Sequence, residues 1–363
     1  MKKILIIITT GFESTGGLTT VMMNYYRAMD KTSFRIDFAS TNEAECVLIN
    51  ELSINDSNYY CLGNRKKEVL HYIRNLRKLI NKKQYDIVHI NGNSATMLIE
   101  TSVAKSCHVK RIICHTHTTQ SEYPVINRIL LPIFRNSYTY ALAVSDKAGK
   151  WLYGKDYTVL NNAINTSKYA YNSEHRSTIK MELGIEGKYV IGTVGKLTSS
   201  KNQAFLIDVF MEYMKTNSNA VLLIVGGGEL ENELKKKALE CGLAEYIIFL
   251  GMRDDVERVI QCFDVFVFTS KYEGFGMVLV EAQASGLHCI VADTIPKETA
   301  VTNNIEYMSL NAPIRKWVDR IEYHRNNESD RTRLSMDACK SIEKHGFNIV
   351  CEAKKLREIY ETK

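Results

Sequence analysis

Long hydrophobic runs are missing from this sequence of 363 residues. No apolar segment approaches the roughly 18 residues of a membrane-spanning helix, so a transmembrane protein is not expected. The opening residues are hydrophobic, but their uninterrupted apolar core is only Ile4–Ile8, and no small-residue cleavage site follows it. The opening therefore predicts a first β-strand rather than a signal peptide.

Closely paired cysteines are also missing. The nine cysteines form no C-x-x-C element, and several of them lie in apolar runs. They are Cys46, Cys61, Cys107, Cys114, Cys241, Cys262, Cys289, Cys339 and Cys351. This usage favours reduced core residues of a cytosolic protein.

Several motifs of nucleotide-binding and hydrolytic enzymes are absent as well. No G-x-G-x-x-G follows the first strand, which argues against a dinucleotide-dependent redox enzyme. The sequence has no G-x-x-x-x-G-K-[ST] P-loop, no G-x-S-x-G elbow and no H-E-x-x-H element. Asp254 and Asp255 are adjacent rather than spaced as D-x-D, and a short helical pattern follows them, so we expect them to cap a helix rather than to bind a metal.

What is present is the composition of a soluble globular protein, with 45% hydrophobic and 24% charged residues. The length suits two domains better than one core. The net charge of +6 is unevenly spread, because residues 1–168 carry 22 Lys and Arg against 13 Asp and Glu, and the remainder carries 25 against 28. This asymmetry predicts that the first half faces an anionic partner.

The densest positive charge lies between Arg65 and Lys83, where apolar residues recur at helical spacing. An ordinary surface helix packed on a sheet explains this pattern, and so does a helix that contacts an anionic membrane surface. Nucleic acid fits less well, because no helix-turn-helix, zinc finger or aromatic-basic sheet motif accompanies the charge.

Strand-like and helix-like segments alternate twice along the chain. Buried runs rich in Val and Ile are typical of parallel strands covered on both faces, so the pattern predicts an α/β protein with two doubly wound domains and a cleft between them. A polar stretch from Asn165 to Arg176 separates the two halves. We expect a first domain over residues 1–168, a second over 169–346, and a closing helical segment, 347–363, that either packs on the second domain or crosses back to the first.

Two glycine turns in the second half follow predicted strands. Gly195, Lys196 and Lys201 come after the predicted strand Tyr189–Gly195, and the glycine run Gly226–Gly228 comes after the predicted strand Ala220–Val225. In an open parallel sheet the carboxyl ends of strands gather ligands, and lysines at such a turn suit a diphosphate as compact charges.

The most informative segment runs from Glu273 to Glu281, two glutamates eight positions apart that follow the strand Asp264–Phe268. Between them Gly274, Phe275 and Gly276 form a turn, and Met277 and Val278 begin an apolar helix. The first N–H groups of a helix are unpaired and attract a phosphate. Two carboxylates on either side of them would accept hydrogen bonds from the hydroxyl groups on both sides of the diphosphate in a sugar nucleotide.

Two elements of the first half carry weaker signals. Gly16 and Gly17 lie between the first strand and a helix, where the backbone approaches a ligand closely. His115 and His117 follow the strand Arg111–Cys114, but no third ligand has a matching spacing, so a metal is not expected. Hydrogen bonding to a sugar hydroxyl is the better functional interpretation, and a structural role remains open for His115.

Taken in this order, the motifs resemble those of the retaining glycosyltransferases of family 4, which have the GT-B fold of two Rossmann-like domains. Glu273 and Glu281 resemble the E-x(7)-E element of that family. Gly195-Lys196-Leu197, followed by Lys201, resembles its glycine-arginine-leucine element and the lysine that follows it. Its asparagine-glycine hinge is similar to Asn162-Ala163. The segment Asp293–Glu298 resembles the branch that builds bacterial capsular polysaccharides and exopolysaccharides.

The resemblance implies a UDP-sugar donor, a saccharide or lipid-linked saccharide acceptor, no metal, no cofactor and no nucleic acid. It implies that Glu281 binds the ribose, Glu273 the donor sugar, and Lys196 and Lys201 the diphosphate, with His117 beside the transferred sugar. The expected catalytic residues are His117, Lys201 and Glu273. The expected substrate-binding residues are Gly16, Gly17, Gly195, Lys196, Lys201, Gly274, Phe275, Gly276, Met277, Val278 and Glu281.

The expected function is the transfer of a hexose or N-acetylhexosamine in surface polysaccharide biosynthesis, in the cytoplasm or at the inner face of the plasma membrane. Two positions depart from the family pattern. Lys196 replaces the usual arginine and lacks its planar fork, and Ala163 replaces the hinge glycine. The first departure keeps an alternative open, a nucleotide-sugar-binding GT-B protein of another class, either an epimerase or a binder without turnover.

Overall fold

The computed structural model describes residues 1–14, 16–327 and 329–362 and divides the chain into two compact units. The first unit comprises Met1–Ala163 together with Ile349–Lys363, and the second comprises Ile164–Asn348. Among the described residues, no helix combines the length and the apolar character that a membrane span requires. The nine cysteines are free thiols. Cys114, Cys262 and Cys289 are buried, whereas Cys46 is exposed, so a core location holds for only some of them.

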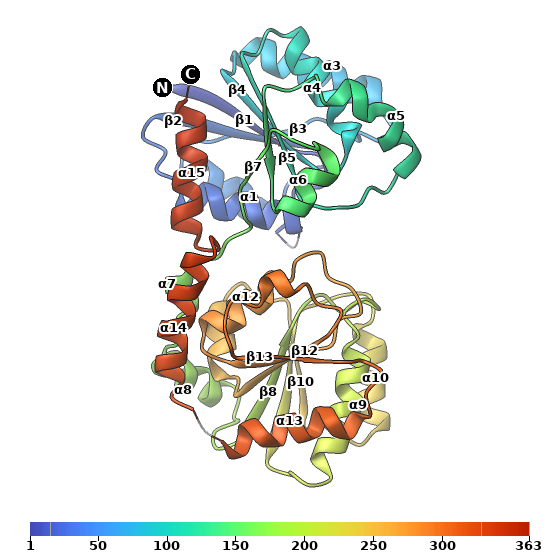
Figure 1. Ribbon diagram of the computed structural model, residues 1–363, viewed down its shortest axis with the longest axis vertical. Coiled ribbons are helices and arrows are strands. Elements are labelled where there is room, and N and C mark those ends of the chain that lie inside the picture. The colour runs from blue at the N-terminus through green and yellow to red at the C-terminus, as the bar shows by residue number, and fades with distance from the viewer. Residues whose placement is uncertain (15, 328, 363) are drawn as a thin grey trace. The chain divides into compact units, whose positions relative to one another are not determined.

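The first unit is built on a seven-stranded sheet whose neighbouring strands are parallel, in the order β3-β2-β1-β4-β5-β6-β7 (Figure 1). The strands are β1 (Lys2–Ile8), β2 (Phe34–Ser40), β3 (Tyr59–Cys61), β4 (Ile87–Gly92), β5 (Arg111–Thr116), β6 (Tyr140–Ala143) and β7 (Thr158–Val159). The central strands lie within a few residues of the predicted ones, and β3 is an additional edge strand.

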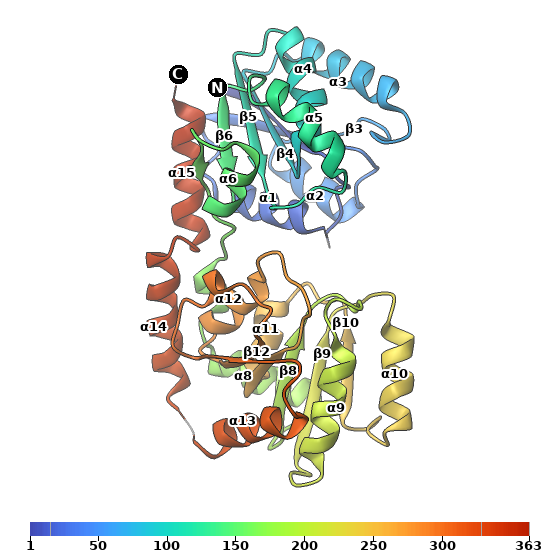
Figure 2. The ribbon, with the colours of Figure 1, turned by 45° about the vertical axis from the view of Figure 1, so that its right-hand side comes forward.

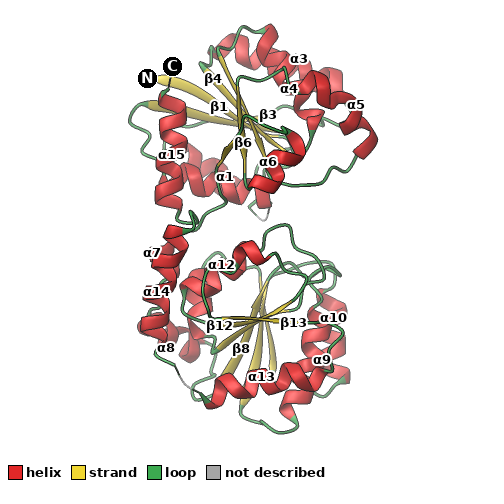
Figure 3. Ribbon diagram, viewed as in Figure 1, coloured by secondary structure: helices red, strands yellow, loops and turns green. Residues whose placement is uncertain are grey.

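Helices cover both faces of this sheet (Figure 3). They are α1 (Gly17–Ala28), α2 (Cys46–Ile54), α3 (Val69–Lys83), α4 (Leu98–Ser106), α5 (Pro124–Phe134), α6 (Asp146–Leu152) and α15 (Ile349–Glu361), with a short 3-10 turn, η1 (Ala95–Met97). Alternate residues of β1 point to opposite faces. Leu5 and Ile7 pack with α3, α4, α5 and α6, whereas Ile4 and Ile6 pack with α1, α2 and α15.

The C-terminal helix α15 therefore contributes to the core of the first unit. Its buried residues Ile349, Ala353, Leu356 and Tyr360 lie in the same cluster as the core residues of α1. The division at Ala163 differs from the expected boundary at 168/169 because the short helix α7 (Thr166–Tyr169) packs against the helices of the second unit.

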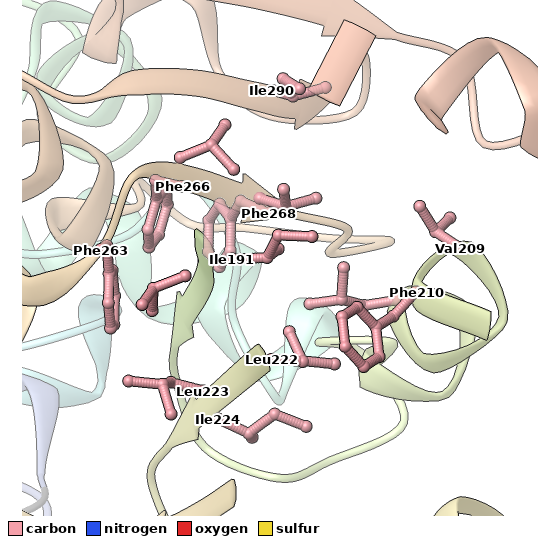
Figure 4. Close-up of a cluster of buried hydrophobic side chains, with 14 of the residues drawn as sticks. Ile191, Val209, Phe210, Leu222, Leu223, Ile224, Phe263, Phe266, Phe268 and Ile290 are labelled. Atoms are coloured by element: carbon pink, nitrogen blue, oxygen red, sulfur yellow. The ribbon is translucent and has the colours of Figure 1, made fainter. Parts of the chain in front are cut away.

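The second unit contains a six-stranded sheet, also with parallel neighbours, in the order β10-β9-β8-β11-β12-β13. The strands are β8 (Tyr189–Val194), β9 (Ala220–Val225), β10 (Ile247–Gly251), β11 (Val265–Phe268), β12 (His288–Ala292) and β13 (Ile305–Met308). Every residue of β9 and β11 is buried. Figure 4 shows part of this core, where Ile191 and Phe266 of neighbouring strands lie near Phe263.

The helices of the second unit also cover both faces of their sheet (Figure 3). They are α7 (Thr166–Tyr169), α8 (Ser173–Glu182), α9 (Gln203–Met214), α10 (Glu231–Glu240), α11 (Val256–Val259), α12 (Met277–Ala284), α13 (Ile314–Asn326) and α14 (Arg331–Lys344), with 3-10 turns η2 (Ile260–Cys262) and η3 (Lys297–Thr299). Parallel strands with crossover helices on both faces are the doubly wound architecture predicted for each half.

Candidate active site

The order of strands in the second unit places two of the predicted glycine turns next to each other. From β8 the chain first adds β9 and β10 on one side of the sheet and then crosses over to add β11, β12 and β13 on the other. The carboxyl ends of β8 and β11 therefore flank the point where the topology reverses, which is where ligands bind in open parallel sheets. The backbone N–H of Lys271, after β11, donates to the carbonyl of Ser200, after β8, at 2.7 Å.

Lys201 and Glu273 meet at this point. The Lys201 ammonium donates to the Glu273 carboxylate, and the Ser270 hydroxyl donates to the same oxygen at 2.9 Å. The Lys201 ammonium also lies 5.6 Å from the centre of the Phe268 ring. The Glu273 side chain is only 7% exposed, so this ion pair lies beneath the surface of the turn.

Helix α12 begins directly after the turn. Gly276 precedes it with φ of +85°, a left-handed conformation that a residue without a Cβ adopts readily. Phe275 packs on the Phe347 ring at 5.2 Å, and Met277 and Val278 pack against apolar clusters. With these side chains turned into the protein, the backbone N–H groups at the start of α12 are what the segment offers to an anion.

Glu281 lies just over one turn into α12 and is partly buried. Burial raises the pKa of its carboxyl group from the ordinary value to about 7. A hydrogen bond with the Tyr169 side chain lowers this pKa, and the negative charge of Glu257 raises it. Hydrogen bonds donated by the hydroxyl groups of a ligand would stabilise the ionised form of this carboxyl group and lower its pKa.

The second glycine run closes against the first turn. The N–H of Gly195 donates to the Val225 carbonyl at 2.9 Å, and the N–H of Leu197 donates to the Gly227 carbonyl at 3.0 Å. A Cβ on Gly226 would lie 2.1 Å from the Gly195 carbonyl oxygen, and φ at Gly226 is +130°. Only glycine fits this approach, so the two turns form one continuous backbone surface.

Lys196 and Gly274 are exposed on these turns. The Lys196 carbonyl accepts from the Gln203 side chain at 3.1 Å, which fixes the backbone of the turn.

The capping role expected for Asp255 is wrong: it occupies the N-cap position of α11 without a side-chain cap bond, and its carboxylate accepts from Arg253 at 2.7 Å. The bidentate guanidinium is the stronger partner.

In the first unit the corresponding reversal lies between β1 and β4. Gly16 and Gly17 stand at the start of α1 after β1, and no atom of the described residues lies within 4 Å of a Cβ added to Gly17. His117 follows β5, and its Nε2 lies 3.0 Å from Oδ1 of Asn91 in β4. The structure thus brings His117 to the carboxyl end of the first sheet.

Three histidines form a row behind this point. The ring of His115 lies 4.1 Å from that of His117 and 5.5 Å from that of His89, and Nδ1 of His89 lies 2.6 Å from the Tyr360 hydroxyl. Burial lowers the pKa of all three imidazoles, to about 3 for His115, and the neighbouring imidazoles lower it further for His89 and His117. Low pKa values keep the row neutral at physiological pH. His115 and His89 are fully buried, which makes them core residues.

A polar cavity of about 620 Å³ opens at the same end of the first sheet. Segments after β1, β2, β3, β4 and β5 contribute to it. Its lining includes Thr9, Thr41, Asn64, Ser94, Gln120 and Tyr123, together with the charged residues Arg65, Lys66 and Glu122. Hydroxyl and amide side chains with one aromatic ring are suited to a polyhydroxylated ligand.

Sequence reasoning missed Tyr169 and Asn91. Tyr169 lies in the polar stretch that separates the two halves, and Asn91 ends the buried strand β4. A polar side chain at the carboxyl end of a strand was a usable signal for Asn91, as it was for His117. Among the described residues, no group of three His, Cys, Asp or Glu side chains is arranged to hold a metal ion.

Comparisons with known proteins agree with this architecture. Residues 175–340 match the family model described as Glycosyl transferases group 1, and residues 15–168 match the one described as Glycosyltransferase Family 4. EpsF of Bacillus subtilis (strain 168), a protein named for an inferred glycosyltransferase activity, is 30% identical over 322 residues, which cover 84% of this chain and 84% of EpsF.

A galactosyltransferase of Escherichia coli is 26% identical over 303 residues, which cover 78% of this chain and 77% of that enzyme. Its name gives UDP-Gal as the donor and alpha-D-GlcNAc-diphosphoundecaprenol as the acceptor. Among solved structures, Anabaena HepE in complex with UDP-glucose has a TM-score of 0.77 at 18% identity, with 99% of each chain covered. Both sheets, both family matches and the EpsF likeness lead to one assignment: the chain belongs to the family 4 glycosyltransferases and has the GT-B fold.

Proposed function

We propose that this glycosyltransferase transfers a hexose or N-acetylhexosamine from a UDP-sugar to a saccharide acceptor, with retention of the anomeric configuration. The observation that carries the proposal is the grouping of Lys201, Glu273 and Glu281 around the turn that starts α12, at the topological reversal of the second sheet. Helix N–H groups and a lysine suit the diphosphate, and carboxylates on either side suit ribose and sugar hydroxyls.

In the proposed reaction, the bond between the anomeric carbon and the UDP oxygen breaks, and an acceptor hydroxyl forms the new bond on the same face. The acceptor proton passes to the departing phosphate, so atoms and charge balance without a protein base. Lys201 and the first N–H groups of α12 stabilise the negative charge that develops on the diphosphate. In this proposal, neutral His117 lies beside the transferred sugar.

The acceptor in this proposal is a lipid-linked saccharide used for surface polysaccharide. The name of the Escherichia coli enzyme supports it, because that enzyme acts on a diphosphoundecaprenol-linked sugar. A relative from Acholeplasma laidlawii, 27% identical over 249 residues, is an alpha-monoglucosyldiacylglycerol synthase, and its name supports the lipid part of the acceptor. The polar cavity of the first unit is the proposed acceptor site, since its hydroxyl and amide lining suits a saccharide.

The test is a panel of UDP-sugars, with UDP release measured with and without a lipid-linked saccharide acceptor. We expect acceptor-dependent release with one or a few donors, unchanged by EDTA, and a product whose anomeric coupling matches the donor. Acceptor-independent interconversion of the donor would indicate an epimerase instead. UDP-sugar binding without release under any of these conditions would indicate a binder without turnover.

Two substitutions separate the roles within this site. Glu281→Ala should weaken UDP binding, because the ribose contact is made equally before and during transfer. Glu273→Ala should chiefly slow transfer, because the donor-sugar contact strengthens as charge develops. Losing a hydrogen bond to a charged group costs about 1.5–3 kcal/mol, a roughly tenfold to hundredfold effect. Calorimetry with UDP and single-turnover transfer rates measure the two effects, and an unchanged UDP affinity in Glu281→Ala would contradict the ribose assignment.

A further inference from the structure

Helix α5 turns an almost entirely apolar face outward. Val125, Ile126, Ile129 and Ile133 are 72%, 47%, 67% and 62% exposed. Val125, Ile129 and Ile133 are spaced by four residues, so they form one stripe along the helix. Large aliphatic side chains gathered on one exposed face are unusual for a surface helix of a soluble protein and indicate an interaction surface.

The inner face of α5 is sufficient to hold the helix in place. Phe134 is fully buried in the core of the first unit, and Leu130 and Leu131 pack against the same cluster. The side-chain oxygen of the buried Asn127 accepts from the backbone N–H of Ala95 at 2.8 Å. The outer stripe therefore leaves most of its aliphatic surface exposed on a helix that is held in place by its inner face.

The surroundings of the stripe are strongly basic. Residues 65–135 include 13 Lys and Arg but only 4 Asp and Glu. Helix α4 packs against both α3 and α5, and both views of the ribbon show the three helices side by side on one face of the sheet (Figures 1 and 2). On this face Arg74, Arg77, Lys78 and Lys82 of α3, Lys105 of α4 and Arg128 of α5 are exposed.

Arg65 does not belong to this exposed charge, although it lies in the basic segment of the sequence. Its guanidinium donates to the fully buried carboxylate of Glu100 at 2.6 Å, so this pair is structural. The surface that remains combines an aliphatic stripe on α5 with a field of lysines and arginines beside it. We call it the α5 surface.

We propose that the α5 surface docks on an anionic lipid bilayer, with the aliphatic stripe inserted among the acyl chains near the headgroups and the cations of α3, α4 and α5 beside the lipid phosphates. Apolar insertion and attraction to anionic headgroups are the two contributions that hold a helix in the plane of a membrane. A second copy of this chain is a poorer occupant, because it would bring two surfaces of the same charge together.

The position of Tyr123 connects this surface to the acceptor. Tyr123 precedes α5 and lines the polar cavity, and the Lys66 ammonium lies 5.5 Å from the centre of its ring. Docking through α5 therefore brings the mouth of the cavity to the level of the headgroups, where tyrosine rings favour the boundary between lipid and water. This last step rests on the proposed function, which names a lipid-linked saccharide as the acceptor.

The test compares the binding of the full chain to vesicles of phosphatidylglycerol and phosphatidylcholine with that of two variants. The first is Ile129→Ser combined with Ile133→Ser. The second, a matched control, is Leu239→Ser, which removes a side chain that is 68% exposed on α10 in the second unit. Because four exposed apolar side chains contribute to insertion, we expect the double variant to lose vesicle affinity by roughly tenfold or more and the control to match the wild type.

Salt separates insertion from simple attraction. High salt should weaken wild-type binding only in part, whereas the residual binding of the double variant should disappear, since what remains is screened charge. Tryptophan fluorescence of Ile129→Trp should shift to the blue on anionic vesicles and be quenched by brominated acyl chains. UDP release with a soluble saccharide acceptor should stay at the wild-type rate in the double variant, which separates this surface from the transfer site.

Equal vesicle binding by the wild type and the double variant overturns the proposal, and so does an unshifted Ile129→Trp spectrum. A wild-type dimer in sedimentation equilibrium that the double variant abolishes, without any vesicle binding by either protein, assigns the stripe to a second copy of the chain and also overturns it. Normal vesicle docking with no transfer to any acceptor would leave the α5 surface in place and contradict the proposed function instead.

Discussion

Lys201 and Glu273 were expected to contact different parts of a donor substrate, and in the structure they bond to each other. The pair explains how a carboxylate that is only 7% exposed is accommodated beside an apolar strand end. A diphosphate would compete with Glu273 for the Lys201 ammonium, and a sugar hydroxyl could replace the lysine as the donor to Glu273. Exchange of partners at this pair would therefore couple phosphate binding to sugar binding.

The raised pKa of Glu281 leads to a prediction about stability. The pKa of Glu281 is about 7 in the folded state and lies above its value in the unfolded state. Below about pH 4.5 the group is protonated in both states, so it does not lower the free energy of unfolding. As pH rises from there to about 7, the unfolded state loses its proton first, and the free energy of unfolding falls. Glu281→Gln removes the charge and keeps an acceptor for Tyr169. We expect it to raise the unfolding free energy by on the order of 2–3 kcal/mol at about pH 8 and to have little effect at about pH 4.5.

Urea unfolding of the wild type and Glu281→Gln at several pH values measures this difference. The protein has two tryptophans, Trp151 in the first unit and Trp317 in the second, so Trp151→Phe in both proteins isolates the unit that contains Glu281. Titration of every other group cancels between the two proteins. A stability difference that does not change with pH would contradict the raised pKa.

Asn91 leads to a prediction about His117. The Asn91 amide nitrogen faces the carbonyls of Ile7 and His89 at 3.4 and 3.5 Å, so its oxygen faces Nε2 of His117 and requires the proton there. Nδ1 of His117 is then the unprotonated nitrogen, and it is buried without a hydrogen-bond partner among the described residues. We expect Asn91→Leu to leave UDP affinity unchanged and to slow transfer by roughly tenfold, one lost orienting contact.

The nitrogen-15 chemical shifts of the His117 ring report its tautomer directly. They should show a protonated Nε2 in the wild type and a mixture of tautomers in Asn91→Leu. The same mixture in both proteins would remove Asn91 from its positioning role, whatever happens to the rate.

The glycine turn after β9 leads to a prediction about one element. Gly226→Ala places a methyl group 2.1 Å from the Gly195 carbonyl oxygen at a φ of +130°, whereas Gly242→Ala, with φ of +68°, meets no atom within 4 Å. The control should lose about 1 kcal/mol from backbone strain alone. Gly226→Ala should lose more, roughly 2–4 kcal/mol, and should weaken UDP binding because the turn moves away from Gly195.

Urea unfolding followed by Trp317 and calorimetry with UDP test this pair of variants. Equal losses in Gly226→Ala and Gly242→Ala would show that the two turns tolerate separation. The prediction concerns the fit between the turns, so a loss of stability without a change in UDP affinity would place the turn outside the donor site.

The elements that the sequence predicted well are those with buried runs. Ala220–Val225 was predicted to the residue, because a strand covered on both faces is apolar throughout. The edge strands Tyr59–Cys61 and Ile305–Met308 were missed, since each is short and only half-buried and so lacks a continuous apolar run. Glu273 and Lys201 were predicted as site residues from local spacing. Their pairing was not, because it depends on β8 and β11 lying side by side.

The chain as a whole is arranged so that its last helix completes the first domain. Glu352 of α15 is fully buried and accepts from the backbone N–H of Asn161 at 3.0 Å, close to where the chain leaves the first unit. Further along the helix, the Tyr360 hydroxyl bonds to His89. The core of the first unit is therefore completed only after the whole second unit has been synthesised.

This arrangement predicts which unit a C-terminal substitution destabilises. Leu356 is fully buried in the core of the first unit, and Ile342, fourteen residues earlier, is fully buried in the second. Leu356→Ala should cost about 2–5 kcal/mol and lower the urea midpoint reported by Trp151, while the Trp317 midpoint stays near the wild-type value. Ile342→Ala is the mirror control, and it should shift the Trp317 midpoint and leave that of Trp151. Recording each midpoint with the other tryptophan replaced by phenylalanine keeps the two signals separate. If Leu356→Ala instead lowered the Trp317 midpoint alone, the C-terminal helix would belong to the second unit.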